Sequence, residues 1–335
     1  MYIWVNINIR DVFTMKKLTF GIYPGGATGT DTGHELVACK KPNDPTQINL
    51  ALAKLQTAGQ PFLIRCYLHY LGLGKFENLT PEDPLQFIAD GRKLDLVLGY
   101  HSVNGDITDW AKFIREQIAF YGNHLAKIQI TEEPNLHGFP AVDGDYPNVR
   151  LAVIHGVIAA KNEIVKLGLA IEVGFNGVPT FDPKNDFWRE LGSRQSAEFI
   201  RSLDYVGLDF FPDVFRPVAL DDLHDAVVHV LSHYRNVSLR EAGIPTHVPI
   251  HITENGWATS TDRPDTKQAE VLEMVVRTIY ENRELYNITH YELFDLRDAD
   301  SSNPNIFYQF GIMRDDYSPK PAFVVYKKLI VELGN

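Results

Sequence analysis

Cysteine is scarce in this chain: only Cys39 and Cys66 occur among its 335 residues. Disulfide-stapled folds need an even, closely spaced set of cysteines, and Cys66 falls inside a run with the pattern of a strand. We therefore expect two free thiols and no disulfide framework. With 44% hydrophobic residues, a chain of this length can bury a large core without covalent support.

Long hydrophobic runs and an excess of basic residues are also missing. No stretch reaches the roughly 18 consecutive apolar residues of a membrane-spanning helix, and residues 1–10 lack the basic and small-residue features of a secretory signal. The formal net charge is −11, whereas nucleic-acid binding needs positive charge to neutralise phosphates. We therefore expect a cytoplasmic protein that binds a neutral or cationic small molecule, and neither a membrane nor a nucleic acid.

The sequence shows no linker, low-complexity tract or composition shift that would separate two domains. A strand pattern follows directly after Met15-Lys16-Lys17, which looks like an alternative start. Residues 1–14 are therefore interpreted as an N-terminal extension and residues 15–335 as a single domain. The extension could come from the choice of start site or add a strand at the bottom of the domain, and the sequence allows both.

Short apolar, β-branched runs alternate with longer amphipathic segments throughout residues 15–335. The predicted strands are Leu18–Tyr23, Phe62–His69, Leu94–His101, Ala126–Thr131, Ala170–Phe175, Tyr205–Phe211, Pro249–Glu254 and Thr289–Leu296. The predicted helices are Pro45–Thr57, Asp109–Tyr121, Val149–Leu167, Phe187–Leu203, Leu220–Ala242, Thr266–Leu285 and Ala322–Leu333. Eight strands that alternate with helices predict an α/β protein with a single (β/α)8 TIM barrel.

Two glutamates stand where predicted strands end. Glu133 follows the run Ile128-Gln-Ile-Thr and precedes Pro134, and Glu254 follows Ile250-His-Ile-Thr and precedes Asn255-Gly256. The carboxyl ends of the strands form the active-site face of a (β/α)8 barrel. Two carboxyl groups at one cleft are what glycoside hydrolysis needs, one to protonate the leaving oxygen and one to attack or stabilise the sugar carbon.

These strings resemble the retaining glycoside hydrolases of clan A. Glu132-Glu133-Pro134-Asn135 is similar to the Asn-Glu-Pro motif of the clan, and Thr253–Thr259 to its nucleophile segment. Weaker similarity extends through the predicted sixth and eighth strands to Gly311–Phe323. The resemblance implies a (β/α)8 barrel with an acid/base glutamate after the fourth strand and a nucleophilic glutamate after the seventh. The predicted strand order puts Glu133 and Glu254 at these two places.

The resemblance implies a two-step displacement on a β-linked O-glycoside. Glu254 would attack the anomeric carbon while protonated Glu133 gives its proton to the leaving oxygen, and water would then enter with Glu133 as base. The negative charge of Glu254 would raise the pKa of Glu133 until Glu254 is esterified. We expect a carbohydrate substrate and no cofactor, and the oligomeric state stays open.

The sequence departs from the clan at two positions. The clan has an asparagine before the acid/base residue, where its amide contacts the sugar 2-hydroxyl, but Glu132 stands there in this chain. The clan also has a tyrosine on the sixth strand that bonds to the nucleophile, whereas Phe210-Phe211 occupy that region. Either another donor orients Glu254 or none does, which leaves room for a barrel without hydrolytic activity.

Further residues at strand ends are candidates for binding the sugar. Arg65 on the second strand matches the arginine that the clan places beneath the nucleophile, where it would keep Glu254 ionised. Trp257 and Phe294 are candidate platforms for the apolar face of a sugar. The remaining candidate substrate-binding residues are Tyr100, His101, Glu132, Asn176, Asp209 and Asp298.

Three alternatives remain at this stage. The glycine-rich segment Tyr23–Gly29 has neither the Rossmann nor the P-loop spacing, so it is better interpreted as a barrel loop than as a phosphate site. His69, His101 and His251 could hold a catalytic zinc ion in a metal-dependent hydrolase or isomerase, although no metal-binding spacing links them. A barrel that binds a carbohydrate or a partner without turnover is the other alternative, supported by Glu132 and the missing tyrosine.

Overall fold

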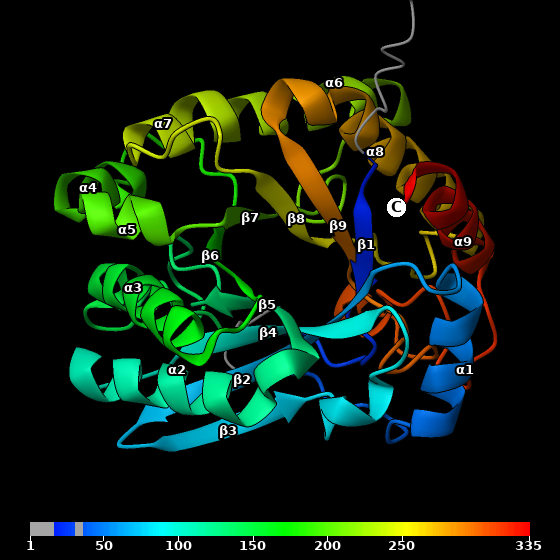
Figure 1. Cartoon of the computed structure of the whole chain (residues 1–335). Helices are drawn as coiled ribbons and strands as arrows, with labels where there is room; N and C mark the ends of the chain where they lie inside the picture. Colours follow the sequence, from blue (N-terminus) through cyan, green and yellow to red (C-terminus); the bar gives the residue numbers. More distant parts are fainter. Residues whose placement is uncertain (1–16, 31–35) are drawn as a thin grey trace, which may run out of the picture.

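The computed structural model describes residues 17–30 and 36–335, and they form a closed barrel of parallel strands surrounded by helices (Figure 1). The barrel strands are β1 (Thr19–Ile22), β2 (Phe62–Gly72), β4 (Arg92–Tyr100), β5 (Leu125–Ile130), β6 (Glu172–Gly177), β7 (Tyr205–Asp209), β8 (Ile250–Asn255) and β9 (Ile288–Leu293). Each pairs in parallel with its sequence neighbour, and β1 pairs with both β2 and β9, which closes the ring. The predicted (β/α)8 barrel is confirmed.

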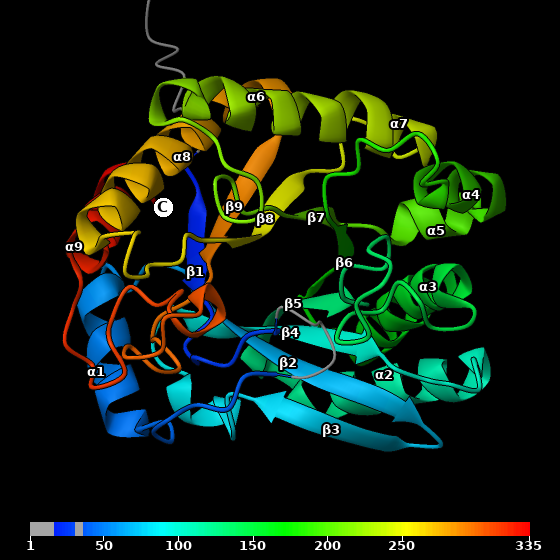
Figure 2. The ribbon, with the colours of Figure 1, turned by 180° about the vertical axis from the view of Figure 1, so that it is seen from behind.

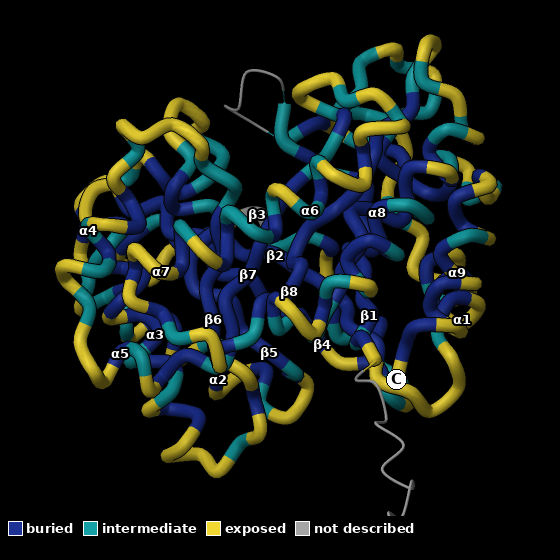
Figure 3. The backbone as a smooth tube through the Cα atoms, turned by 90° about the horizontal axis from the view of Figure 1, so that it is seen from above, coloured by how far each residue is buried: buried dark blue, intermediate teal, exposed yellow. Residues whose placement is uncertain are grey.

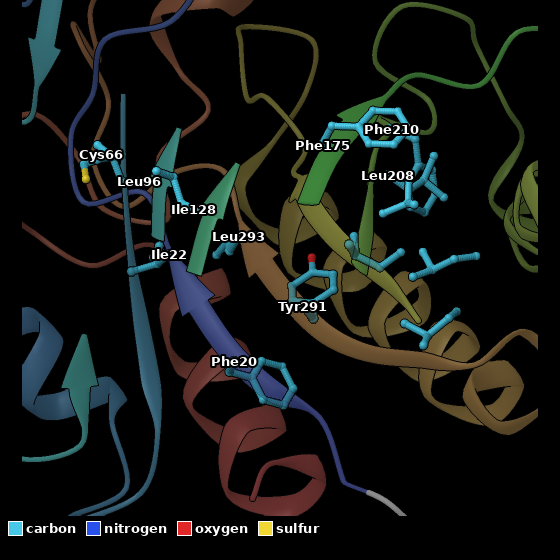
Figure 4. Close-up of a cluster of buried hydrophobic side chains, with 14 of the residues drawn as sticks. Phe20, Ile22, Cys66, Leu96, Ile128, Phe175, Leu208, Phe210, Tyr291 and Leu293 are labelled. Atoms are coloured by element: carbon cyan, nitrogen blue, oxygen red, sulfur yellow. The ribbon is translucent and has the colours of Figure 1, made fainter. Parts of the chain in front are cut away.

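Side chains alternate between the two faces of the barrel strands, as the pleat requires. On β2, Ile64 and Cys66 join the hydrophobic layer under the helices, while Arg65 and Tyr67 face the interior, where they contact interior residues of other strands. Figure 4 shows members of this layer, among them Phe20 on β1. The outward positions therefore hold the barrel to its helices, and the inward positions are free to carry polar groups.

Helices cover the outside of the ring, which leaves the strands buried at its centre (Figure 3). They are α1 (Pro45–Leu55), α2 (Ile107–Tyr121), α3 (Val149–Leu167), α4 (Phe187–Arg194), α5 (Ala197–Ser202), α6 (Leu223–His233), α7 (Leu239–Glu241), α8 (Asp265–Tyr286) and α9 (Pro321–Leu333). The Asp44 carboxylate accepts from Thr46 N and Gln47 N at the start of α1. Asp106 caps α2 in the same way, so this helix begins two residues before the predicted Asp109 because its cap lies further upstream.

The second helix of the barrel pattern is replaced by an antiparallel strand. β2 continues past its predicted end and folds back as β3 (Lys75–Thr80), which lies along the outside of β2 (Figure 2). Residues 81–91, all of them described, contain only the 3-10 turn Pro84–Phe87. The turn Gly72-Leu73-Gly74 has positive φ at all three residues, a backbone that glycine supplies at little cost. The sequence analysis missed this hairpin.

One predicted helix is divided in two. Residues 187–203 form α4 and α5, because the Ser196 hydroxyl accepts from Phe199 N and starts a new helix. Both cysteines are free, as predicted. The proposed extension, residues 1–14, lies outside the described residues. None of the described helices is both long and apolar enough to cross a membrane.

Candidate active site

Glu254 enters the barrel interior through a β-bulge. The regular pairing of β8 with β7 shifts by one residue between Ile252 and Glu254. In an unbroken strand Glu254 would point outward with Ile252, whereas the extra residue turns it inward beside Thr253. The carboxylate is 7% exposed, so its partners decide its charge and orientation.

Two side chains of β2 hold the Glu254 carboxylate. The Tyr67 hydroxyl donates to Glu254 Oε1 at 2.5 Å, and Arg65 Nη2 lies 3.3 Å from the same oxygen. Arg65 Nε donates to the Tyr67 hydroxyl at 2.7 Å, and Arg65 Nη1 donates to Asp95 Oδ2 at 2.7 Å. Arg65 therefore lies under Glu254, where the clan resemblance puts it. Its donors are bonded to protein groups, so it positions the carboxylate and does not itself offer a free contact to a sugar.

Tyr67 was not foreseen from the sequence. The clan tyrosine comes from the sixth strand, and here that region carries Phe210 and Phe211. Tyr67 supplies a phenol donor from the second strand instead. The signal that could have found it is its spacing: Tyr67 is two residues from Arg65, so both point to the same face of the strand.

Glu133 follows a sharp bend at the end of β5, the fourth barrel strand. Thr131 and Glu133 have φ values of 71° and 43°, in the left-handed region that non-glycine residues rarely adopt. The Glu133 backbone N–H donates to Asn176 Oδ1 at 2.9 Å, and the Glu132 N–H donates to Asp143 Oδ2 at 2.8 Å. These bonds pin the bend, which allows consecutive side chains to leave the regular alternation of a strand.

Asp143 is a second residue that the sequence analysis missed. It is fully buried, and Oδ2 also accepts from Tyr100 N at 2.7 Å. Its other oxygen lies 3.3 Å from His101 Nε2. One carboxylate therefore ties the end of β4 to the segment that carries Glu132. No motif announces it, because Asp143 lies in an irregular loop ten residues after Glu133.

Glu132 enters the same group of carboxylates as Glu254. Oxygens of Glu132, Asp209 and Glu254 lie within 4.8 Å of one another. Glu132 Oε2 accepts from Gln129 Nε2 at 2.6 Å and lies 3.5 Å from Arg65 Nη2. Burial and the charge of Glu254 raise the pKa of Glu132 well above its usual value, and Arg65 opposes this shift. A raised pKa means that Glu132 can carry a proton, in which case it can donate as the asparagine of the clan does.

Burial, together with the charges of Asp209 and Glu254, raises the pKa of Glu133 well above its usual value. The side chain is only half-buried as a whole, so it keeps access to the surface. A carboxyl group whose pKa is raised and that is still accessible is suited to act as a general acid.

Asp209 joins the two segments that carry the glutamates. Its Oδ1 accepts from the Thr253 hydroxyl at 2.5 Å, and its Oδ2 accepts from Asn176 Nδ2. Asn176 in turn accepts from the backbone of Glu133. Asp209 and Asn176, both predicted as sugar contacts, thus have these polar groups bonded within the protein and act as positioning residues. Burial and the charge of Glu254 raise the pKa of Asp209 to about 7.

Two predicted contacts, at the end of β4 and directly after it, do not reach this group. Tyr100 points to the same face of β4 as Leu96 and Leu98, and its ring packs on Trp110 of α2 at 5.2 Å between centroids. Its side chain is on the outer face of the barrel, contrary to the expectation that it binds substrate, because strand alternation turns it outward. His101 stacks on Tyr146 at 4.7 Å and, through its position beside Asp143, supports the loop.

Trp257 and Asp298 are committed to structural contacts. Trp257 is 2% exposed, donates to Asp213 Oδ2 at 3.1 Å, and has the Arg263 guanidinium over its ring at 3.7 Å. It therefore offers no open face to a sugar. Asp298 accepts from Lys320 Nζ at 2.8 Å and from the Ser301 hydroxyl at 2.8 Å. The sequence shows that a side chain is polar or aromatic, but it does not show which neighbours already contact that side chain.

Phe294 lies beside the residues that hold the nucleophile candidate. Its ring stacks on Tyr23 at 5.3 Å, and the Tyr23 ring meets Tyr67 edge-on at 5.2 Å. Phe294 keeps 9% of its surface exposed. Of the two predicted aromatic platforms, it is the one whose ring belongs to the aromatic cluster next to Glu254.

The three histidines proposed for a catalytic metal are not brought together. His69 and His101 pack against each other at 4.3 Å between centroids, near the carboxyl ends of β2 and β4. His251 is the second residue of β8, at the amino-terminal end of the barrel, where it stacks on Tyr205 at 4.2 Å. His251, early in its strand, and the other two histidines, late in theirs, therefore lie at opposite mouths of the barrel. That metal hypothesis is therefore wrong.

No protein-family model matches the sequence, and no curated protein sequence matches it either. Solved structures do match in fold. A family 39 glycoside hydrolase from Bacteroides cellulosilyticus WH2 has a TM-score of 0.62 and 18% identity over 96% of this chain and 65% of that chain. A β-glucuronidase from Ruminococcus gnavus in complex with uronic deoxynojirimycin has a TM-score of 0.61 and 13% identity over 94% and 49% of the two chains.

A third structure is of similar size to this chain. It is the apo structure of a β-glucosidase, with a TM-score of 0.57 and 14% identity over 86% of this chain and 87% of that chain. The chain spans about half to two thirds of the length of the two larger proteins. It therefore shares the (β/α)8 fold of known glycoside hydrolases, as the resemblance to clan A predicted, and no family within the clan is identified.

Proposed function

We propose that the protein is a retaining O-glycosidase with Glu254 as nucleophile and Glu133 as acid/base. The observation that carries this proposal is the support of Glu254: a buried carboxylate that receives a phenol donor from Tyr67 and faces the Arg65 guanidinium. Both partners hold the carboxylate in a fixed orientation inside the barrel. Glu133 belongs to the same group of charges, and its raised pKa favours the protonated form. A carboxyl group with a raised pKa is suited to the role of acid, and an oriented carboxyl group near it is suited to the role of nucleophile.

In the first step, Glu254 Oε2 would form a bond to the anomeric carbon while the bond from that carbon to the leaving oxygen breaks and Glu133 protonates the departing oxygen. The glycosyl ester neutralises the charge of Glu254, which removes one of the causes that hold the proton on Glu133. Glu133 can then accept a proton from the incoming water, and the attack of that water cleaves the ester. Asp209 would keep the two glutamate segments in register throughout, since it bonds to Thr253 and Asn176.

We propose a β-linked sugar that is neutral or cationic at C2. The β-linkage follows the clan resemblance and the activities named for two of the structural neighbours. A uronate, the kind of group named for the Ruminococcus protein, needs a free cationic donor, and the donors of Arg65 are already bonded to protein groups. Hydroxyl or ammonium donors suit the carboxyl oxygens of Glu132, Asp209 and Glu254 better.

The alternative of a barrel that binds without turnover was favoured by the missing sixth-strand tyrosine. Tyr67 offers the same kind of donor to Glu254 from another strand. The structural reason to prefer an inactive barrel is thereby weakened, and catalysis is the function that the geometry supports best.

A panel of aryl β-glycosides tests the proposal. Release of the aryl group should depend on the wild-type protein and continue in the presence of a chelator. Proton NMR of the first sugar formed should show the β-anomer, because two displacements restore the starting configuration. An α-anomer as first product would overturn retention, and no release from gluco-, galacto-, manno-, xylo- and 2-amino sugars alike would overturn the hydrolase.

A further inference from the structure

The amino-terminal mouth of the barrel, opposite the glutamates, contains a second group of side chains with metal-ligating chemistry. Donor atoms of Glu172, His251 and His290 lie within 4.8 Å of one another. They come from three barrel strands, β6, β8 and β9, and His251 is in register with His290. The alternation of β8 and β9 directs both imidazoles to the barrel interior, on the same faces as Thr253 and Glu292.

His251 is the observation that requires a partner. It is fully buried, and neither of its ring nitrogens has a hydrogen-bond partner within the described residues 17–30 and 36–335. Burying a polar group without a bond costs free energy, and a neutral imidazole has one donor and one lone pair to satisfy. The Tyr205 ring stacks on His251 at 4.2 Å and the His290 ring is tilted against it at 3.7 Å between centroids, and neither ring bonds to these nitrogens.

The other two side chains are arranged as ligands. The Thr289 hydroxyl lies 2.9 Å from His290 Nδ1, which leaves Nε2 for a metal and fixes the ring, as outer hydrogen bonds do for metal-bound histidines. His290 Nε2 lies 3.9 Å from Glu172 Oε2. The Glu172 side chain is 48% exposed, so an ion has a path from solvent and the carboxylate is free to move.

We propose that Glu172, His251 and His290 bind a divalent transition-metal ion of the zinc type at the bottom of the barrel. Two imidazoles and a carboxylate are a donor set that zinc accepts, with water in the fourth position. Ligand bonds of about 2.1 Å bring tetrahedral donors to roughly 3.4 Å from one another, so the three side chains must close slightly. Glu172, the most exposed of them, can supply most of that movement.

The charges around the group permit a cation. Lys127, in the barrel interior, is paired with Glu292 and lies 3.4 Å from Asp95 Oδ2. Lys161, near Glu172, is bonded to Asp204 at 2.7 Å.

A metal at this place would not take part in the glycoside chemistry, because it lies at the opposite end of the barrel from Glu133 and Glu254. It would tie three parallel strands together where their pairing begins. Its role is therefore stabilisation of the barrel by binding to the folded state.

Calorimetric titration of the chelator-treated full chain with Zn²⁺ tests the proposal, and the visible absorption of the Co²⁺ form reports tetrahedral geometry. We expect one ion per chain, a higher Tm with Zn²⁺, and affinity lowered at least roughly tenfold by Glu172→Gln and by His290→Asn. Glu172→Gln is the variant less liable to disturb folding, because the Glu172 side chain is half-exposed. Circular dichroism of each variant checks that the barrel is folded.

Two control variants separate this site from other binders. His224→Ala removes an exposed histidine that lies beside Asp225 and Glu281. Glu132→Gln removes one carboxylate from the group that Glu132 forms with Asp209 and Glu254 at the other end of the barrel. Both should bind Zn²⁺ like the wild type. Binding that is absent, that survives Glu172→Gln and His290→Asn unchanged, or that is lost in Glu132→Gln would overturn the proposal.

Discussion

The Tyr67 hydroxyl donates to Glu254 Oε1 at 2.5 Å, and the same hydroxyl accepts from Arg65 Nε at 2.7 Å. Tyr67 thus lies between the cation and the carboxylate, and both β2 residues act on one oxygen of Glu254. Burial raises the pKa of Tyr67 well above its usual value, so the phenol keeps the proton that it donates. The other carboxylate oxygen remains to meet a substrate.

Tyr67→Phe should lower kcat/KM by about 10- to 100-fold, because a hydrogen bond to a charged group contributes roughly 1.5–3 kcal/mol. The ring stays in the aromatic cluster, but the buried Arg65 Nε loses its acceptor, so the Tm should fall as well. Measurement of kcat/KM with one aryl glycoside and of the Tm checks both effects.

Tyr23→Phe is the matched control for this change. Tyr23 packs on Tyr67 in the same cluster, but its hydroxyl bonds to the Thr80 hydroxyl at 2.7 Å and not to a carboxylate. Its removal should leave kcat/KM near the value of the wild type. If the two variants lower kcat/KM equally, Tyr67 acts through packing and not through its bond to Glu254.

Glu254→Ala should abolish turnover, and added azide should restore part of the rate by occupying the space of the carboxylate. The product of the rescued reaction should be an α-glycosyl azide, because a single displacement inverts a β-glycoside. NMR of the product decides the matter: a β-azide would mean that another group forms the covalent bond.

Glu133→Ala should impair substrates in proportion to how much their leaving group needs a proton. Aryl groups that are stable as phenolates should react at rates near that of the wild type in the first step, whereas alkyl glycosides should lose about 10²- to 10⁴-fold. A plot of rate against leaving-group pKa should be steeper for the variant. Equal losses for all leaving groups would remove Glu133 from the role of acid.

The repeating pattern of the chain was enough to predict eight strands and a closed barrel. It was not enough for the β2–β3 hairpin, because β3 follows a short turn inside the segment that the pattern predicted to be a single connection between two barrel strands. The pattern also placed both glutamates at strand ends correctly. Their orientation was beyond it, since Glu254 depends on a bulge and Glu133 on positive φ at two non-glycine residues, and neither leaves a mark on hydrophobic periodicity.

Strand alternation, used more strictly, would have improved the candidate site. It assigns Tyr100 to the outer face with Leu98, and it assigns Tyr67 to the inner face with Arg65. The role of Asp143 could not be foreseen in this way. It depends on a loop returning to the end of β4, and only the three-dimensional path of the chain shows that contact.

The stability of the protein should fall as the pH rises from about 4 to 7. The pKa of Asp209 is raised from 3.8 to about 7 in the folded state, so the folded chain keeps a proton in this window that the unfolded chain has released. The folded state binds more protons, and the free energy of unfolding therefore falls with rising pH, by an amount on the order of a few kcal/mol for this group.

Glu254→Gln provides the control for this pH effect. The charge of Glu254 is the second cause of the Asp209 shift, after burial, and the amide still accepts from Tyr67. The pH dependence of the Tm between 4 and 7 should become shallower in this variant. A slope equal to or steeper than that of the wild type would show that the carboxylate group does not set the pH dependence.

Glu132 is the position where the structure offers the sharpest test of substrate choice. Its carboxyl lies with Asp209 and Glu254 and is bonded to Gln129, at the place where clan A carries an asparagine. If Glu132 meets the C2 substituent, Glu132→Asn should favour 2-hydroxy over 2-amino sugars by about tenfold in relative kcat/KM, because a charged hydrogen bond to the ammonium is lost. Glu132→Gln keeps the length of the side chain and removes only the charge, so it should shift the ratio in the same direction. If Glu132 contacts only Gln129 and Arg65, both variants should lower the Tm. They should also change kcat/KM by the same factor for all sugars, 2-deoxy sugars included. That outcome would show that Glu132 does not contact the substrate.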